Sequence, residues 1–347
     1  MLMKEEKPLV AVVILNWNGK KYLEQFLDKV VRYSSPHQVV LADNNSTDES
    51  VTYVRTNFPD VQIIVNTENG GFAKGYNDAL SKVEAEYYIL LNSDVEVTEN
   101  WITPLLEVMQ SDNSIAGCQP KIRSFHRKGY FEHAGAAGGF LDKDYFPFCR
   151  GRIFEAIEED KGQYNDTIEI FWATGACLMI RADLYHSSGG LDNDFFAHME
   201  EIDLCWRLKR LGYSFYAVGN SEVYHVGGGT LDYMNPKKTY LNFRNSLYMI
   251  TKNYEGWLFP KIFRRLCLDG LAGIRFLLSG NLTHIGSLFM AHMHYYKALG
   301  KLLKKRKEIR SSIATPKALT CVYPKSILWQ KFIKGVAHFS DLEGWKK

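Results

Sequence analysis

Short apolar runs alternate with helix-like segments over the first hundred residues of the chain. Between the runs, polar and apolar positions follow a helical period, most clearly from Lys20 to Arg32 and from about Gly71 onward. Ser46 and Glu49 have the spacing of a capping box, which predicts Ser46 as the N-cap of the second helix. The alternation predicts an α/β domain with a mostly parallel, doubly wound sheet. The apolar runs that we assign to buried strands are residues 9–16, 39–43, 61–65 and 87–91.

Polar side chains follow each of the four predicted strands. Any one of these groups is ordinary turn chemistry. The carboxyl ends of parallel strands, however, lie at one edge of a sheet, where the ligands of open α/β sheets bind. The coincidence at four strand ends therefore favours a polar ligand at this edge. The groups are Asn16 and Asn18, then Asp43, Asn44 and Asn45, then Asn69 to Gly71, then Asn92, Ser93 and Asp94.

Two of these strand ends carry a carboxylate. Asp94 follows the fourth strand, and a carboxylate there suits a hard divalent cation and the phosphates that the cation neutralises. Asp43 ends the second strand, where acidic residues accept hydrogen bonds from the base or ribose of a nucleotide. The chain has no Gly-x-Gly-x-x-Gly sequence after the first strand and no Walker lysine pattern. This argues against dinucleotide oxidoreductases and P-loop NTPases.

Three further acids, Glu200, Glu201 and Asp203, precede a helical pattern that ends near Gly212. They are expected in the first turn of a helix, where the helix dipole alone would explain them. An enzyme that transfers a group to a hydroxyl without a covalent intermediate also needs one carboxylate as general base. The residues alone leave both roles open.

Composition excludes some functional classes. A chain of 347 residues with 46% hydrophobic residues can bury a full core and suggests roughly two domains. The net charge of +3 is too small to indicate a nucleic-acid partner. The six cysteines contain no Cys-x-x-Cys pair, and the N-terminus has no apolar signal region. The expected compartment is therefore reducing and cytoplasmic.

Residues 236–347 have a different pattern and predict a helical C-terminal region. Residues 276–296 contain no Asp, Glu, Lys or Arg, but their polar residues and glycines favour an amphipathic helical hairpin over a membrane span. A basic run at 301–307 follows. This order suits peripheral contact of residues 260–310 with the anionic inner face of the cell membrane. The alternative is a basic face that packs on its own domain or on a second subunit of a homo-oligomer.

Several motifs resemble those of the family-2 inverting glycosyltransferases, which have a GT-A type fold, and in particular their rhamnosyltransferase-like branch. The similarity covers roughly residues 8–230. It implies a GT-A domain over residues 1–235, with a donor half at about 8–120 and an acceptor half at about 121–235. The motifs are VVILNWNG, LADNNSTDES, NTENGGFAKGYNDAL, YYILLNSDVEV, FWATGACLMIRADLYHSSGGLDNDFFAHMEEIDLCWRLKRLG and VYHVGG.

The resemblance implies a role for each matching residue. Asp94 and His225 are the implied ligands of Mg²⁺ or Mn²⁺, although Asn92 replaces the first acid of the family's Asp-x-Asp motif. Glu201 is the implied base, with Glu200 as the runner-up and Asp203 in support. The implied acceptor side is Trp172, Thr174 and Gly175, where core packing of the tryptophan is an equal alternative. The implied nucleotide-sugar contacts are Asn16, Asn18, Asp43, Asn45, Asn69, Gly71, Lys74, Asn77, Asn92 and Ser93.

The expected function is that of an inverting glycosyltransferase. It would move a sugar from a nucleoside-diphosphate sugar, with dTDP-rhamnose and UDP-sugars as candidate donors, to a hydroxyl of a cell-surface glycan or lipid-linked saccharide. One alternative is a non-catalytic glycan- or nucleotide-sugar-binding protein of the same fold. A sugar nucleotidyltransferase is another, but it needs a glycine-rich basic loop after the first strand, and residues 16–19 (NWNG) offer neither feature.

Overall fold

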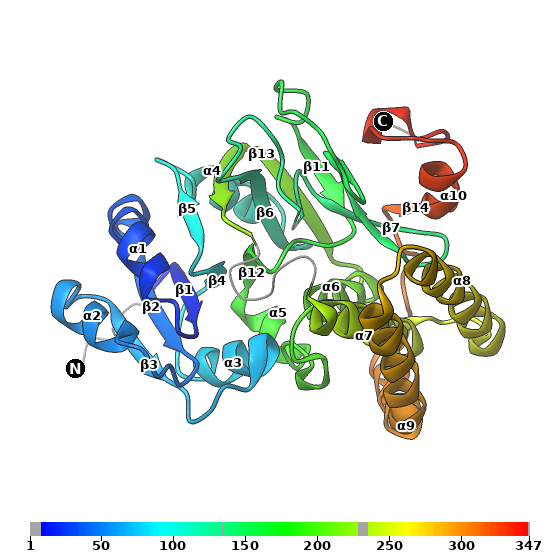
Figure 1. Ribbon diagram of the computed structural model, residues 1–347. Helices are drawn as coiled ribbons and strands as arrows, with labels where there is room; N and C mark the ends of the chain where they lie inside the picture. The colour runs from blue at the N-terminus through cyan, green and yellow to red at the C-terminus, as the bar shows by residue number, and fades with distance from the viewer. Residues whose placement is uncertain (1–7, 134, 228–234, 346–347) are drawn as a thin grey trace.

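The computed structural model describes residues 8–133, 135–227 and 235–345 (Figure 1). Its N-terminal part alternates strands and helices as predicted, with β1 (Val10–Asn16), α1 (Lys20–Ser34), β2 (Gln38–Asp43), α2 (Ser50–Asn57), β3 (Gln62–Val65), α3 (Gly71–Leu80) and β4 (Tyr87–Asn92). These four strands pair in the order β3-β2-β1-β4, and every pair is parallel. The register places Asn16 opposite Asp43, so the polar strand ends lie at one edge.

The strands are buried because helices cover both faces of this part of the sheet. Val10, Val12 and Ile14 of β1 belong to the apolar cluster that includes side chains of α1. The intervening Ala11 and Val13 belong to a second cluster, which includes side chains of α3. Successive side chains of a strand point to opposite faces, so an unbroken apolar run is what such a strand requires.

The predicted capping box at Ser46 is wrong. Helix α2 begins at Ser50, and its N-cap residue Glu49 makes no side-chain capping hydrogen bond. The Ser46 hydroxyl lies instead 2.6 Å from Asp43 Oδ1, and its backbone N–H donates to Asp43 Oδ2. Ser46 therefore bonds to the buried Asp43 carboxylate and does not cap α2.

The second half of the sheet is mixed. Its elements are β5 (Val95–Val97), α4 (Thr103–Ser111), β6 (Ile115–Ser124), β11 (Thr167–Ile170), β12 (Cys177–Arg181), α5 (Ala182–Ser187), the 3-10 turn η1 (Asn193–Phe195), α6 (Glu200–Arg210) and β13 (Ser214–His225). The order continues from β4 through β12, β6 and β13 to β11. Strand β12 runs antiparallel to both of its neighbours, while β13 runs parallel to β6. Strand β5 pairs with the end of β13 and sets Val95 opposite His225.

A small second sheet fills the irregular stretch between β6 and β11. It has the order β10-β9-β8-β7-β14, with β7 (Gly139–Asp142), β8 (Pro147–Cys149), β9 (Arg152–Ile153), β10 (Ala156–Ile157) and β14 (Val322–Tyr323). Strand β14 comes from near the C-terminus and is followed by α10 (Ile327–Phe332) and the 3-10 turn η2 (Phe339–Asp341). The end of the chain therefore packs on the predicted acceptor half, which no pattern in the sequence indicated.

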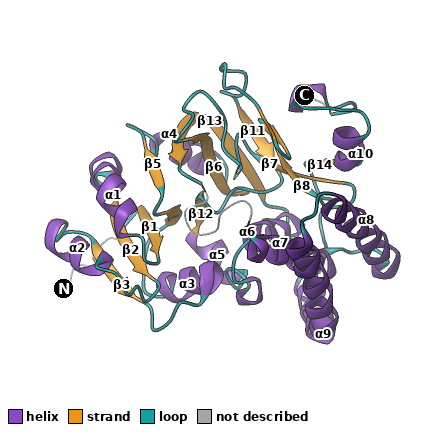
Figure 2. Ribbon diagram, viewed as in Figure 1, coloured by secondary structure: helices purple, strands orange, loops and turns teal. Residues whose placement is uncertain are grey.

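Three long helices follow the sheet: α7 (Pro236–Asn253), α8 (Leu258–Leu278) and α9 (Leu282–Ser312). The short connection from residue 279 to 281 makes α8 and α9 the predicted hairpin. Both helices lie at one end of the molecule, beside α7 (Figure 1; coloured by secondary structure in Figure 2). Within the described ranges, no helix has the length and apolarity needed to cross a membrane.

Candidate active site

A histidine between two carboxylates forms one corner of the site. His225 Nε2 lies 3.1 Å from Asp94 Oδ1, and its Nδ1 lies 3.1 Å from Glu132 Oε2. All three residues are at least nine-tenths buried. The pairing of β5 with β13 creates this corner because it holds the residue after Asp94 opposite His225. Gly227 turns the chain away at φ +71°, and a Cβ there would stand 2.6 Å from Glu132 Oε1.

The two carboxylates keep this histidine charged. Burial opposes the imidazolium, but the charges of Asp94 and Glu132 outweigh it and raise the pKa of His225 to about 10. Within the described part of the chain, no three His, Cys, Asp or Glu side chains are grouped so as to hold a metal ion. The Asp94 carboxylate nevertheless suits Mg²⁺ or Mn²⁺, which usually keep water and phosphate oxygens as further ligands. His225 Nε2 would join the ligands once the cation displaced its proton, because a histidine ligand must be neutral. The donor set therefore fits a cation that shares its coordination with a diphosphate.

Asp43 organises the loops beside β1 and β2. It is fully buried, and its carboxylate accepts hydrogen bonds from Asn16 Nδ2 at 2.9 Å and from Ser46. Asn18 Oδ1 accepts the backbone N–H of Thr47 at 2.7 Å. These bonds tie the loop after β1 to the loop after β2.

The other strand-end residues remain open to solvent to different degrees. Asn45 is exposed and has a left-handed backbone with φ +59°. Asn92 and Ser93 are half-buried at the end of β4. Their amide and hydroxyl groups make no side-chain hydrogen bond to any described residue, which leaves them free for a ligand.

The start of α3 packs against the segment that precedes α6. Asn69 Oδ1 accepts the backbone N–H of Gly71 at 3.0 Å. Gly71 has φ +81°, and a Cβ there would stand 2.4 Å from the carbonyl oxygen of Phe196. That carbonyl accepts the backbone N–H of Phe72 at 2.6 Å. Glycine is therefore needed at position 71 both for its backbone conformation and for the close approach.

Two polar side chains of α3, Lys74 and Asn77, already contact other residues of the protein. Lys74 forms ion pairs with Asp78 and, at 3.4 Å, with Glu68. Asn77 Nδ2 donates to the carbonyl of Leu191 at 2.7 Å, and its Oδ1 accepts the Tyr185 hydroxyl at 2.6 Å. The structure thus directs Asn77 toward the segment before α6.

The segment from residue 190 to 199, which we call the base loop, leads into α6. Phe196, His198 and Met199 have φ of +65°, +70° and +75°, which is uncommon for bulky residues. The side-chain amide of Asn245 on α7 holds this backbone. Its Nδ2 lies 3.0, 2.8 and 2.7 Å from the carbonyl oxygens of Phe195, Ala197 and His198. The C-terminal helices therefore help to fix the backbone from which the predicted base projects.

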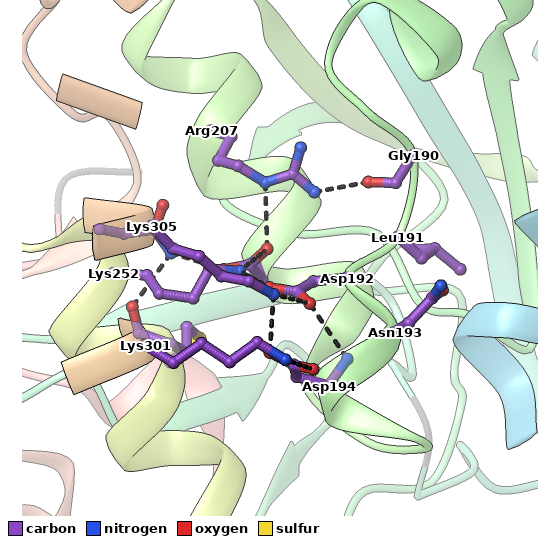
Figure 3. Close-up of polar contacts among 12 residues, drawn as sticks. Gly190, Leu191, Asp192, Asn193, Asp194, Arg207, Lys252, Lys301 and Lys305 are labelled. Carbon is purple, nitrogen blue, oxygen red and sulfur yellow. Dashed lines mark hydrogen bonds and ion pairs between the residues drawn. The ribbon is translucent and has the colours of Figure 1, made fainter. Parts of the chain in front are cut away.

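Lysines of α7 and α9 also bind the base loop (Figure 3). Lys252 pairs with Asp192, Lys301 pairs with Asp194, and Lys305 pairs with both aspartates. Burial opposes a charge on Asp192, but Lys252 and Lys305 hold the pKa of this carboxyl well below its usual value. Two members of the predicted basic run thus face their own domain.

Asp203 is occupied by the same network. It is fully buried, pairs with Arg207 at 3.0 Å and with Lys252 at 2.9 Å, and accepts Asn253 Nδ2 at 2.7 Å. These donors belong to the fold itself, so the carboxylate is committed to contacts within the protein. This arrangement suits the supporting role that we expected for Asp203.

The two glutamates at the start of α6 differ in exposure. Glu200 is 3% exposed, and Glu201 is half-buried. One carboxylate oxygen of each is buried without a hydrogen-bond partner among the described residues. Burial raises the pKa of Glu201 to about 7, and burial together with the charge of Glu201 raises the pKa of Glu200 well above its usual value.

Glu201 and Glu132, the partner of His225, both act on the buried Cys149 thiol. Burial raises the pKa of the Cys149 thiol to about 12, and the charges of both Glu132 and Glu201 add to this rise. Both carboxylates therefore act on the same buried thiol, and Glu132 contacts His225 directly. The site thus combines a cation-binding corner with a carboxylate that can exchange a proton near neutral pH.

The predicted acceptor-side residues pack against other parts of the protein. Trp172 is 6% exposed, and its indole N–H donates to the Phe140 carbonyl at 3.0 Å. Thr174 is buried, and its hydroxyl accepts the backbone N–H of Ala176. A Cβ at Gly175 would stand 2.9 Å from the ring of Phe72. These contacts match the packing alternative for Trp172.

Comparison with known proteins identifies the family. The sequence profile of glycosyl transferase family 2 matches residues 11–189, which is more than half of the chain. The chain belongs to glycosyl transferase family 2. The predicted enzyme class is thereby confirmed. The predicted GT-A type α/β fold is confirmed by the two solved structures described below.

Two curated relatives of this family 2 glycosyltransferase are named as sugar transferases. One is the N-acetylglucosaminyl-diphospho-decaprenol L-rhamnosyltransferase of Mycobacterium tuberculosis, which is 22% identical over 72% of this chain and 86% of the relative. The other is the low-salt glycan biosynthesis hexosyltransferase Agl10 of Haloferax volcanii, 21% identical over 82% of this chain and 90% of the relative.

Two solved structures share the fold. The first is GalNAc-T7 with UDP, GalNAc and Mn²⁺, with a TM-score of 0.55 and 16% identity, over 72% of this chain and 48% of that one. The second is the mannosyltransferase PcManGT of Pyrobaculum calidifontis with GDP-Man and Mn²⁺, with a TM-score of 0.50 and 16% identity, over 88% and 86% of the two chains.

Sequence reasoning missed Glu132 and the lysines that hold the base loop. Glu132 lies in the irregular stretch after β6, and its one visible signal was an acid flanked by Phe131 and His133. Lys252 lies in the predicted helical C-terminal region, where no signal in the sequence set it apart. Its burial follows from the packing of α7 on α6, which only the tertiary structure shows.

Proposed function

We propose that this protein is an inverting glycosyltransferase that moves one sugar from a nucleoside-diphosphate sugar to an acceptor hydroxyl. The observation that carries the proposal is Glu201. Its half-buried carboxylate has a pKa raised to about 7 and lies in the same region as the corner of Asp94, His225 and Glu132. A base with this pKa accepts a hydroxyl proton near neutral pH.

In the proposed reaction, the acceptor oxygen attacks the anomeric carbon as Glu201 takes its proton. The bond from that carbon to the diphosphate oxygen breaks, and the nucleoside diphosphate leaves from the opposite face with the electron pair. The configuration at the anomeric carbon is inverted, through an oxocarbenium-like transition state. Asp94 and His225 would hold a divalent cation, which stabilises the negative charge of the departing diphosphate.

The proposed donor-binding residues are those at the parallel strand ends. Asn18, Asn45, Asn92 and Ser93 present polar groups there, while Asp43 holds the two loops together. Rhamnose or another hexose is the proposed sugar, supported by the rhamnosyltransferase and hexosyltransferase named among the relatives. The decaprenol-linked substrate in the name of the first relative supports a lipid-linked saccharide as acceptor.

We place the catalytic domain at residues 1–235 and the helical region at 236–347. Because a lipid-linked acceptor lies in a membrane, contact of the helical region with the membrane surface belongs to this proposal.

Thermal unfolding in the presence of UDP-, dTDP- and GDP-sugars with Mn²⁺ or Mg²⁺ tests donor binding. A donor at about 100 times its dissociation constant adds about 2.7 kcal/mol of stability. Incubation of the stabilising donor with candidate saccharides, followed by NMR of the anomeric proton, then tests transfer. An inverted product supports the proposal, and a retained configuration contradicts it. Stabilisation without any release of nucleoside diphosphate would indicate the non-catalytic alternative.

A further inference from the structure

Helix α8 exposes an apolar stripe along its whole length. The stripe consists of Phe259, Phe263, Cys267, Leu271, Ile274 and Leu278, which recur every three or four residues and therefore lie on one face of the helix. Phe259 is 71% exposed and Leu278 is 83% exposed. The side chains buried on the opposite face include Ile262, Arg265 and Asp269. Large side chains in a continuous exposed stripe mark an interaction surface.

Helix α9 continues this surface and adds charge to it. Leu282, Phe289 and Met293 are 65%, 62% and 46% exposed, and their spacing of seven and four residues puts them on one face. The same spacing extended along the helix reaches Lys304 and Lys307. Both lysines are exposed and have no ion-pair partner among the described residues. One face of α9 therefore changes from apolar to cationic along its length.

The charge of the hairpin differs from that of the rest of the chain. Residues 257–307 contain ten Lys and Arg residues but one acid, Asp269, which is buried and paired with Arg265. Acids of the catalytic half neutralise Arg264, Lys301 and Lys305. Lys297, Lys304 and Lys307 are exposed and have no ion-pair partner among the residues that the structure describes. The whole chain has 42 basic and 39 acidic residues, so the remainder carries 32 and 38. An exposed apolar stripe in a cationic setting complements an anionic lipid surface. A second copy of this chain would place the same positive charge opposite itself, which disfavours a symmetric dimer through this face.

The hairpin is also joined to the active site. Lys301 and Lys305 of α9 bind Asp194 and Asp192 of the base loop (Figure 3). These ion pairs join α9 to the loop that leads to Glu201.

We propose that the α8–α9 hairpin lies on an anionic bilayer, with its apolar stripe at the level of the acyl-chain boundary and Lys304 and Lys307 against lipid phosphates. The inference rests on the proposed function in one respect, namely that a lipid-linked acceptor would be presented at that surface. It also revises the sequence-based prediction, because Lys301 and Lys305 of the basic run bind the protein itself.

Flotation with lipid vesicles tests the proposal on the full chain. We expect the protein to float with phosphatidylcholine vesicles that contain about one-third phosphatidylglycerol at low salt, and to bind pure phosphatidylcholine far more weakly. The triple variant Phe263→Ser, Leu271→Ser, Leu278→Ser should bind at least about 100-fold more weakly.

A charge variant keeps the test valid if the apolar variant misfolds. Lys304→Gln with Lys307→Gln should weaken binding about 25-fold, from about fivefold for each lysine. Arg55→Gln with Lys82→Gln removes the same charge from exposed positions of the donor half and should leave binding unchanged.

Three results would overturn the proposal. In the first, the wild-type protein stays unbound to the vesicles at low salt. In the second, the apolar and charge variants float like the wild type. In the third, light scattering shows that the wild type is a dimer and that the triple variant is a monomer. Vesicle binding needs no turnover. Release of nucleoside diphosphate, measured separately without vesicles, therefore reports failure of the proposed function independently of failure of the docking surface.

Discussion

Replacement of the proposed base, Glu201→Gln, is the perturbation whose outcome the structure predicts most fully. The change keeps the size of the side chain and removes its charge. Burial raises the pKa of Glu201 to about 7, and its charge helps to raise the pKa of the buried Glu200. Removal of a charge that is both buried and repelled does not cost folding stability. We therefore expect a folded variant with normal donor binding.

The expected loss of transfer rate follows from the role of a general base. Such a base contributes about 10²–10⁴-fold, so the variant should transfer sugar at least about 100-fold more slowly. The pH profile gives a second readout. Because Glu201 must lose its proton to act, wild-type activity should rise through about pH 7 and fall about tenfold for each pH unit below it. The glutamine variant should lack this acidic limb.

Steady-state release of nucleoside diphosphate from about pH 5.5 to 8.5 measures both effects. Glu107→Gln, at an exposed position of α4, is the matched control and should behave as wild type. Near-normal turnover in Glu201→Gln, or an acidic limb that survives in it, would refute the assignment. If Glu200→Gln alone abolished turnover, the base would be Glu200.

Three further substitutions test the rest of the site. Asp94→Asn should lose the metal-dependent part of donor binding in calorimetry, and equal affinities with and without chelator in wild type would contradict this. Lys252→Met should destabilise the fold by about 3–5 kcal/mol in urea unfolding, since it leaves the fully buried Asp203, and Asp192 beside it, each without one partner. A loss as small as that of the exposed control Lys82→Met would contradict it. Asn245→Ala should cost about 1–3 kcal/mol, because the carbonyls of Ala197 and His198 lose their side-chain donor, and it should lower kcat more than it raises KM. Unchanged kcat would show that the base loop keeps its geometry without this amide.

The parallel half of the fold could be predicted because its signals are local. A buried parallel strand must be apolar on both faces, so β1 and β4 stand out as unbroken apolar runs. Parallel strands also share one edge, which is why Asn16 and Asp43 could be placed together before their register was known. The motifs and their order along the chain then supported the resemblance to the GT-A glycosyltransferases.

The parts that escaped prediction depend on contacts between distant segments. Glu132 reaches His225 because its backbone N–H donates to the Ile122 carbonyl of β6, and β6 pairs with β13; no sequence pattern indicates this. The capping box failed because Asp43 competes for Ser46. The basic run was read as one surface, whereas its helical spacing turns Lys305 toward the base loop and Lys304 toward solvent.

The most direct test is the rate at which nucleoside diphosphate is released from the donor that stabilises the protein best. The rate is measured for the wild type with Mn²⁺, for the wild type with chelator, and for the Asp94→Asn variant with Mn²⁺. Our account predicts release by wild type in Mn²⁺ and a loss of at least about 100-fold in the other two conditions. Release that is equally fast in all three would contradict a cation-binding corner at Asp94 and His225.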